Sequence, residues 1–281
     1  MAHGSDYRDR VIAYYDKTES RFGYSLLFGG RKHFGYYPEG TKHVSMSTAM
    51  RLMEDRVGKA LALPAGSLVL DAGCGEGHTA QHLHERFGLR VDGVDLVDFN
   101  IARGIRRVTK QGLTSNVHLQ VGGYTALPFP DDTFDGVYTL ETLVHAPDYT
   151  QALEEFRRVL KPGGRLVLFE YSMPAQSDLG AKEREIFAAI NEGSAMFSFP
   201  KFENDRFPEI LTDAGYRVES VTDIRYRVAP MLKRMAQICW LPYQIAKLIG
   251  RQTRYINTMA AVEYYRLGEL MHYNIVAAIK P

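Results

Sequence analysis

Short apolar runs alternate with helical patterns through the middle of the chain, from about residue 61 to residue 172. Runs of this kind are typical of buried strands, and the segments between them repeat apolar residues at helical spacing. The expected strands are 67–71, 89–95, 117–121, 134–140 and 165–171, completed by 217–226 and 273–279, and the expected helices are 79–87, 101–111 and 149–160. Strands that alternate with helices form right-handed βαβ units, so the pattern predicts an α/β fold whose parallel sheet carries helices on both faces.

Two segments outside this alternation have a different character. Residues 1–60 are rich in aromatic side chains and predict an N-terminal helical cap. Apolar helical stripes in 231–250 and 255–271 lie between the last two expected strands and predict a helical lid insert, about 230–270, over the strand ends. The remainder, 61–281, would then be one domain that includes this insert. A packed cap or an oligomer interface explains the stripes equally well.

Composition argues against several classes of function. Lys and Arg total 34 and Asp and Glu total 33, so no basic face for a nucleic acid is expected. The first sixteen residues are too charged for a signal peptide, and the apolar stretch 238–249 is too short to span a bilayer. Cys74 and Cys239 make neither a disulfide framework nor a Cys-pair metal site. We expect a cytoplasmic protein without a metal, a nucleic-acid partner or an integral membrane segment.

A glycine-rich turn follows the first expected strand. The strand ends at Asp71, and Gly73, Gly75 and Gly77 alternate in the turn. Glycine permits positive φ and lets a ligand approach the backbone, and the next helix presents free N–H groups to that ligand. Asp71 would repel a pyrophosphate but could hold a cationic amino group, and Asp95, ending the next strand, could accept both ribose hydroxyl hydrogens. The alternative is that Asp71 caps a helix and Asp95 is a surface acid.

These residues resemble the first two motifs of the class I S-adenosylmethionine (SAM)-dependent methyltransferases. The segments 127–135 and 161–164 resemble the family's loop before the fourth strand and its turn before the fifth. The resemblance implies a Rossmann-like seven-stranded sheet with SAM as cofactor. The cofactor-binding residues that it implies are Asp71, Gly73, Cys74, Gly75, Asp95, Leu96, Gly123, Tyr124 and Leu140. Many members place an acid for the adenine amine where this sequence has Gly123, so backbone groups or the Tyr124 ring would have to hold the adenine.

Four further segments narrow the resemblance. Residues 136–147, 170–173 and 14–16 resemble the sterol C-methyltransferase group, and 33–37 resembles an element shared with tocopherol-type methyltransferases. This resemblance implies methyl transfer to a carbon of an isoprenoid alkene. A sterol-like molecule, a prenyl diphosphate and a prenylated specialised metabolite are all candidate substrates, and rearrangement or cyclisation could accompany the transfer.

Methylation of an alkene carbon passes through a carbocation, and this sets what the site must provide. Water must be excluded, aromatic faces stabilise the cation, and a base removes the final proton. We expect His145 to accept the proton or orient the substrate, Glu141 to lie near the methionine end of the cofactor or balance the cation, and Tyr15 to line the site. Each residue also has a structural interpretation: a histidine at a helix start, a carboxylate on a backbone amide, and a core aromatic.

Other functions remain open at this point. A small-molecule O- or N-methyltransferase would use His145 as a conventional base and would need polar anchors in its pocket. A cofactor-binding protein without catalysis would bind SAM and transfer nothing. The lid cations Lys233, Arg234, Arg251 and Arg254 could meet a prenyl diphosphate, although a charge run usually faces solvent. A homo-oligomer whose N-terminal helix covers a neighbour's site is also open.

Overall fold

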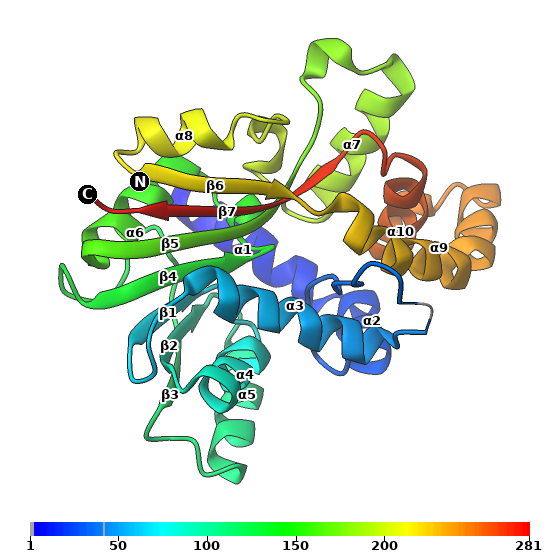
Figure 1. The fold of residues 1–281 in the computed structure, drawn as a ribbon. Helices are drawn as coiled ribbons and strands as arrows, with labels where there is room; N and C mark the ends of the chain where they lie inside the picture. Colours follow the sequence, from blue (N-terminus) through cyan, green and yellow to red (C-terminus); the bar gives the residue numbers. More distant parts are fainter. Residues whose placement is uncertain (1–2, 42) are drawn as a thin grey trace.

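The computed structural model describes residues 3–41 and 43–281, which form a seven-stranded sheet with helices on both faces (Figure 1). The strands are β1 (Leu68–Ala72), β2 (Arg90–Asp95), β3 (Val117–Val121), β4 (Phe134–Leu140), β5 (Leu160–Ser172), β6 (Arg217–Asp223) and β7 (His272–Ile279). The α-helices are α1 (His3–Asp16), α2 (Thr18–Phe28), α3 (Met46–Leu61), α4 (His78–Phe87), α5 (Asp98–Lys110), α6 (Tyr149–Val159), α7 (Ala181–Gly193), α8 (Phe207–Asp213), α9 (Arg225–Leu248) and α10 (Ile256–Arg266). Short 3-10 helices are η1 (Leu143–His145), η2 (Gln176–Asp178), η3 (Phe199–Lys201) and η4 (Gln252–Arg254). The predicted α/β sheet is confirmed.

The sheet contains the crevice that a ligand requires. Its strand order is β3-β2-β1-β4-β5-β7-β6, and β1 pairs in parallel with β2 on one side and β4 on the other. The order of strands along the chain reverses between β1 and β4, so the connections leave these two strand ends in opposite directions. Ligands of open α/β sheets bind at the carboxyl ends of the strands at this point.

The last two strands close one edge of the sheet in a different way. The strand β7 runs antiparallel between β5 and β6, and the helices α9 and α10 occupy the connection that precedes it (Figure 1). The predicted strand 217–226 ends earlier, at Asp223, because the Asp223 carboxylate accepts a hydrogen bond of 2.9 Å from the Arg225 amide and α9 begins there. The helical insert predicted between these strands is therefore present, with a first helix that starts before residue 231.

The buried faces of the helices explain how they attach to the sheet. The helix α3 begins at the N-cap Ser45 and buries Met53, Val57 and Leu61 against β4, β5 and the neighbouring helix α4. The two helices approach closely at Gly58, where an added Cβ would lie 2.3 Å from the Phe87 ring. This helix lies within residues 1–60 but packs in the helix layer of the sheet, whereas α1 and α2 pack over the strand ends.

The cap and the lid contact each other above those strand ends. The Glu19 carboxylate on α2 accepts hydrogen bonds from the amide of Thr258, at 2.8 Å, and from its hydroxyl, at 2.7 Å. The two Thr258 groups lie in the first turn of α10, where amides lack partners within the helix. Glu19 thus connects α2 to the start of α10, and the two helical segments cover the crevice together.

Candidate active site

The turn after β1 has a backbone that only glycine accommodates well. Gly73, Gly75 and Gly77 have φ values of 95°, 54° and 68°. A Cβ on Gly73 would lie 2.6 Å from the side chain of Thr142, and one on Gly77 would lie 2.6 Å from Leu119. These two glycines therefore let the turn pack closely against its neighbours, whereas a Cβ on Gly75 would meet only the Lys32 side chain, at 3.9 Å, so the turn has open space at Gly75, which lines a pocket.

Asp95 lies beside this turn with its carboxylate held by the backbone. Its Oδ2 accepts a hydrogen bond from the Gly75 amide at 2.9 Å, and its Oδ1 accepts one from the Val97 amide at 2.8 Å. Burial raises the pKa of Asp95, and these two amides oppose that effect. The Asn100 side-chain amide also donates to Oδ1, at 3.4 Å, so Oδ2 is the oxygen with the most room to accept from a ribose hydroxyl.

Asp71 lies across the turn, buried and without a hydrogen-bond partner for its Oδ2 among the described residues. Burial raises the pKa of this carboxyl to about 7, although the Tyr138 hydroxyl opposes the increase. A buried carboxylate without a partner is unfavourable, and a cation beside it would satisfy it. The ammonium group of SAM has the required charge, so the residues around this turn fit the cofactor that the sequence implies.

The predicted cofactor residues gather in one pocket, with one exception. Asp71, Gly73, Cys74, Gly75, Asp95, Leu96, Tyr124 and Leu140 all line it. Gly122 lines the pocket where Gly123 was expected, and a Cβ on Gly123 would instead meet Leu96 at 3.1 Å and the Tyr7 hydroxyl at 3.3 Å. The Tyr124 hydroxyl donates a hydrogen bond of 2.6 Å to the Thr142 carbonyl, which fixes its ring in the pocket wall.

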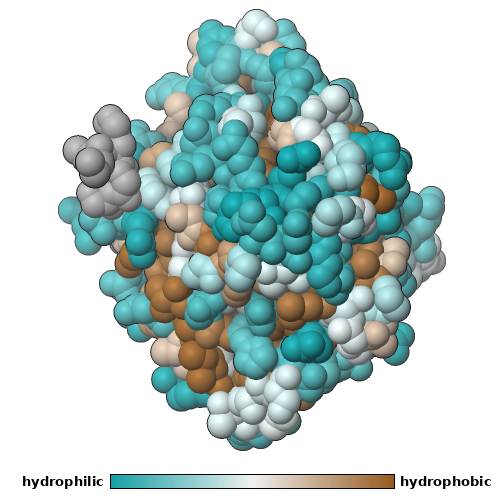
Figure 2. Space-filling model, turned by 90° about the vertical axis from the view of Figure 1, so that its left-hand side faces the viewer, coloured by the Kyte–Doolittle hydropathy of each residue, from teal (hydrophilic) through white to brown (hydrophobic). Residues whose placement is uncertain are grey.

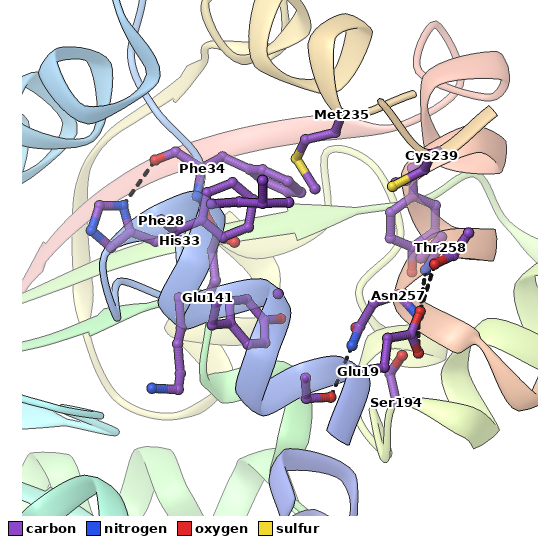
Figure 3. A pocket seen from close by; sticks show the side chains of 18 of the residues that line it. Glu19, Phe28, His33, Phe34, Glu141, Ser194, Met235, Cys239, Asn257 and Thr258 are labelled. Carbon is purple, nitrogen blue, oxygen red and sulfur yellow. Dashed lines mark hydrogen bonds between the residues drawn. The ribbon is translucent and has the colours of Figure 1, made fainter. Parts of the chain in front are cut away.

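A second, larger cavity adjoins this pocket beneath the cap and the lid (Figure 3). Its volume is about 190 Å³, against about 70 Å³ for the pocket over the turn. Aromatic rings and methionines from α1, α2, β5, α9, α10 and the segments after α2 and α7 make most of its wall. They are Tyr14, Tyr15, Tyr24, Phe28, Phe34, Tyr171, Tyr264, Met196, Met231 and Met235. A cavity lined in this way suits a bulky apolar ligand.

The two cavities share a wall made of Tyr15, Lys32, His33, Glu141 and His145, each of which lines both. A reactive group bound over the β1 turn and an apolar molecule in the larger cavity would therefore meet at these side chains. The structure brings together Tyr15, Glu141 and His145, the three residues that the sequence predicts to be catalytic.

Glu141 follows β4 in a left-handed backbone conformation, with φ of 59°. Its Oε1 accepts hydrogen bonds from the Phe34 amide at 2.6 Å and from the Tyr273 hydroxyl at 2.7 Å, whereas its Oε2 has no partner among the described residues. Burial raises its pKa to about 7, and the positive charge of His33 opposes this increase. Non-glycine residues in this conformation cost about 1–3 kcal/mol, so the surrounding contacts must hold the strained turn in place.

His145 is held from both sides of its ring. The Nδ1 atom lies 3.0 Å from the Ala195 carbonyl oxygen and Nε2 lies 3.1 Å from the Tyr15 hydroxyl. A carbonyl only accepts hydrogen bonds, so Nδ1 carries the proton and Nε2 accepts from Tyr15. Burial lowers the pKa of His145 and raises that of Tyr15, so the pair is neutral around pH 7.

Glu170, at the end of β5, supports the loop that carries both residues. Its Oε1 accepts hydrogen bonds from the amides of Thr142, at 3.1 Å, and Leu143, at 2.9 Å, at the start of η1. The side chain is fully buried, and burial raises its pKa to about 8. Glu170 therefore determines where the turn between Glu141 and His145 lies.

Replacing Glu170 by alanine should destabilise the protein by about 2–4 kcal/mol, because two buried amides lose their acceptor. Glu170→Gln is the matched control: with a pKa of about 8 the native side chain is mostly protonated at neutral pH, so glutamine keeps its charge and its Oε1 acceptor. Urea unfolding of the three proteins measures the difference. Equal stability of the alanine and glutamine variants would contradict this role.

Two residues of the shared wall, Lys32 and His33, were not identified from the sequence as site residues. The Lys32 Nζ donates to the Gly30 carbonyl at 3.3 Å and lies 3.6 Å from a Glu76 oxygen, and burial lowers its pKa. His33 donates through Nδ1 to the Phe34 carbonyl, at 2.9 Å. Its Nε2 faces the buried Glu54 carboxylate at 3.4 Å, which raises the pKa of His33 against the effect of burial. The motif 33–37 was the available signal, but it has no periodicity that shows which way the side chains point.

Comparisons with known proteins agree with this geometry. Residues 69–164 match the family model of a methyltransferase domain. The SAM-dependent Diels-Alderase iccD of Talaromyces variabilis is 32% identical over 277 residues, which are 96% of this chain and 94% of that protein. A sterol 24-C-methyltransferase of Yarrowia lipolytica is 26% identical over 98% of this chain and 68% of its own length. The crystal structure of the [4+2]-cyclase SpnF has the same fold, with a TM-score of 0.79, 24% identity and coverage of 98% of this chain and 97% of that one.

Proposed function

The chain belongs to the SAM-dependent methyltransferase family, and from this premise we propose that it methylates a carbon of an apolar, alkene-bearing small molecule. The observation that carries the proposal is the wall shared by the pocket over the β1 turn and the aromatic cavity. When bound, SAM supplies an electrophilic methyl group. Asp95 would hold its ribose, Asp71 its ammonium group and Lys32 its carboxylate.

The aromatic cavity would hold the alkene and stabilise the cation that it becomes. The rings of Tyr14 and Tyr15 pack edge to face with centroids 4.8 Å apart, and Tyr15 and Tyr24 have centroids 6.2 Å apart. Their faces attract a cation by roughly 0.5–2 kcal/mol each, and the covering cap keeps water away from it. The alkene π electrons would form the new bond to the methyl carbon as its bond to sulfur breaks, which leaves S-adenosylhomocysteine and a positive charge on the other alkene carbon.

Glu141 is the group that would end the reaction. Its Oε2, which has no partner among the described residues, would take a proton from a carbon next to the cation, and the electrons of that C–H bond would form a new alkene. A pKa of about 7 suits a base that must accept a proton and later release it at neutral pH. The sequence offered His145 either as the proton acceptor or as a substrate-orienting group, and the hydrogen bond that Nε2 of His145 accepts from Tyr15 favours the orienting role.

The Tyr15–His145 pair would orient the substrate rather than accept its proton. We expect Tyr15→Phe and His145→Ala each to lower kcat by about five- to tenfold, because each removes the same hydrogen bond. The double variant should be no slower than the slower single variant, since coupled residues are not additive. Steady-state rates measure this, with Tyr149→Phe, on the outer helix α6, as the control. If kcat of the double variant fell by the product of the two single fold-losses, the two residues would act independently and the coupling would be contradicted.

The polar part of the cavity wall favours a neutral substrate. Glu19 bonds to Thr258, and Asn257 donates to Ser20 at 2.8 Å and accepts from Tyr14 at 2.6 Å, so these groups satisfy one another. Arg234 on the lid donates to the Val44 carbonyl at 2.6 Å instead of facing the cavity. A sterol-like molecule or a prenylated metabolite fits this lining better than a prenyl diphosphate, and the sterol 24-C-methyltransferase relative supports that choice.

A second candidate function is cyclisation of a polyene without loss of the cofactor's methyl group. It is favoured by the Diels-Alderase relative, whose similarity spans nearly the whole chain and therefore includes the cap and lid that build the cavity. In that reaction the chain would hold the cofactor as a fixed cation beside the polyene, and Tyr15 and His145 would position the reacting ends.

One experiment separates these functions from each other and from binding without catalysis. The protein is incubated with methyl-labelled SAM and a panel of sterols, prenylated aromatics and linear polyenes, and both products and S-adenosylhomocysteine are quantified. A product that carries the label on a carbon, formed together with an equal amount of S-adenosylhomocysteine, supports the proposal. Label on oxygen or nitrogen would mean heteroatom methylation, and a cyclised isomer without S-adenosylhomocysteine would mean cyclisation. Bound SAM with none of these products would overturn catalysis on such compounds.

A further inference from the structure

The helix α9 presents apolar side chains to solvent along one face. Ile238, Leu241, Ile245 and Leu248 are 50%, 60%, 54% and 87% exposed, and their spacing of three and four residues places them in one line. We call these four residues the α9 stripe. The opposite face of the helix is buried, so the stripe is additional to the surface by which α9 attaches to the protein.

More exposed apolar residues extend this surface. Trp240 and Ile249 are each 56% exposed, and Tyr255, just before α10, is 42% exposed. The two helices project at the right of Figure 1, on the side turned away from the viewer in Figure 2. On the face that Figure 2 does show, the hydrophobic areas are broken up by hydrophilic residues. Large continuous apolar surfaces on a protein mark a site of interaction.

The charge around the stripe has one sign. Residues 224–262 contain seven Lys and Arg residues and no Asp or Glu. Arg225 and Arg227 pair with acids outside this segment, and Arg234 bonds to a carbonyl. The remaining cations, Lys233, Lys247, Arg251 and Arg254, form no ion pair with any residue that the structure describes. Lys233 and Lys247 lie seven residues to either side of Trp240, so these three side chains share one flank of the stripe.

From these observations we propose that the α9 stripe docks on an anionic lipid bilayer. Apolar side chains at the centre would enter the boundary of the acyl chains, while the flanking cations meet lipid phosphates and carboxylates. A second copy of the chain is a poorer occupant, because a two-fold contact through this face would bring like charges together. A nucleic acid would leave the apolar stripe without a partner. No helix in the described parts of the chain is both long and apolar enough to cross a membrane.

The aromatic cavity lies beside the α9 stripe, so membrane docking would bring the cavity to the bilayer. Ile238 of the stripe and Leu27 of α2, which is 39% exposed, both line the aromatic cavity. An apolar substrate dissolved in the bilayer could pass between them into the cavity without crossing water. This use rests on the function proposed above, whereas the docking itself does not.

Trp240 is the one tryptophan of the chain, so its fluorescence reports directly on the surface in question. The full chain is mixed with vesicles of phosphatidylcholine alone and with vesicles that also contain phosphatidylserine, at low and high salt. We expect the anionic vesicles to shift the emission to shorter wavelength and to sediment the protein, with both effects reduced by salt. Absence of binding to anionic vesicles would overturn the proposal. So would an emission shift without vesicles that follows protein concentration, with a doubled mass in light scattering, because the occupant would then be a second copy.

Substitutions separate the apolar and the charged contributions. Leu248→Ser should weaken vesicle binding about tenfold, and Lys247→Gln about fivefold, the equivalent of about 1 kcal/mol per cation. Matched controls on α5 are Ile105→Ser, at a side chain 46% exposed, and Lys110→Gln, which should bind vesicles like the unaltered chain. SAM affinity, measured by calorimetry without lipid, should be the same for all four variants. Loss of vesicle binding with unaltered SAM affinity supports docking, and equal vesicle binding by Leu248→Ser and Ile105→Ser would refute it.

Discussion

Replacing Glu141 by glutamine should lower kcat for methylated alkene product by roughly 10²- to 10⁴-fold, the range expected for loss of a positioned general base. Glutamine keeps the volume and an acceptor for Phe34 and Tyr273, but its amide cannot take up a proton at neutral pH. SAM binding should be nearly unchanged, because the proposed ammonium and ribose contacts are those of Asp71 and Asp95, which the substitution leaves in place. Product analysis and calorimetry measure the two effects. A variant with native kcat would remove Glu141 from the chemistry.

The same carboxyl predicts the pH dependence of the reaction. Its pKa of about 7 lies above the ordinary value, so the proton-accepting form is depleted as pH falls below 7, and the rate should rise as pH increases through about 7. The Tyr273 hydroxyl lowers this pKa by donating to Oε1. Tyr273→Phe should therefore raise the pKa and move the rate profile to higher pH. A profile that stayed in place would mean that another group controls the rate.

Asp95→Asn should raise the dissociation constant of SAM by about 10²- to 10³-fold, the effect of losing one or two hydrogen bonds to a charged acceptor. In asparagine one of the two oxygens becomes an NH2 donor, which would face the backbone amide that this oxygen now accepts from, that of Gly75 at Oδ2 or that of Val97 at Oδ1. Either placement costs an interaction that the carboxylate satisfied.

Calorimetric titration with SAM measures this change, and Asp92→Asn on the same strand is the control. Asp92 contacts the exposed His118 at 3.0 Å, outside the lining of the cofactor pocket. The control should bind SAM normally. Native affinity in Asp95→Asn would contradict the ribose contact and with it the placement of the cofactor over the β1 turn.

The parts of this protein that follow from local physics could be predicted from the sequence. Buried parallel strands need continuous apolar runs, and the turn over which a cofactor lies needs glycine, so β1 to β5 and the Gly73 turn are visible in the pattern. Asp71 and Asp95 were also predictable, because the end of each parallel strand faces the same edge of the sheet. By contrast, β6 ends early and α9 begins early because of the Asp223 carboxylate, a contact that periodicity does not include.

The sequence by itself thus determined the sheet, the glycine turn after β1 and the two acidic residues beside that turn, Asp71 and Asp95. Only the tertiary structure decided what the reactive groups face: Glu141 contacts Phe34 and Tyr273, which are 107 and 132 residues away along the chain. The tertiary structure also brings the Tyr15 hydroxyl into a hydrogen bond with Nε2 of His145 and places Lys32 in the wall between the two cavities. The physical reason is that a proton affinity depends on burial and on neighbours brought in from distant segments, whereas hydrophobic periodicity records only which side of an element is buried.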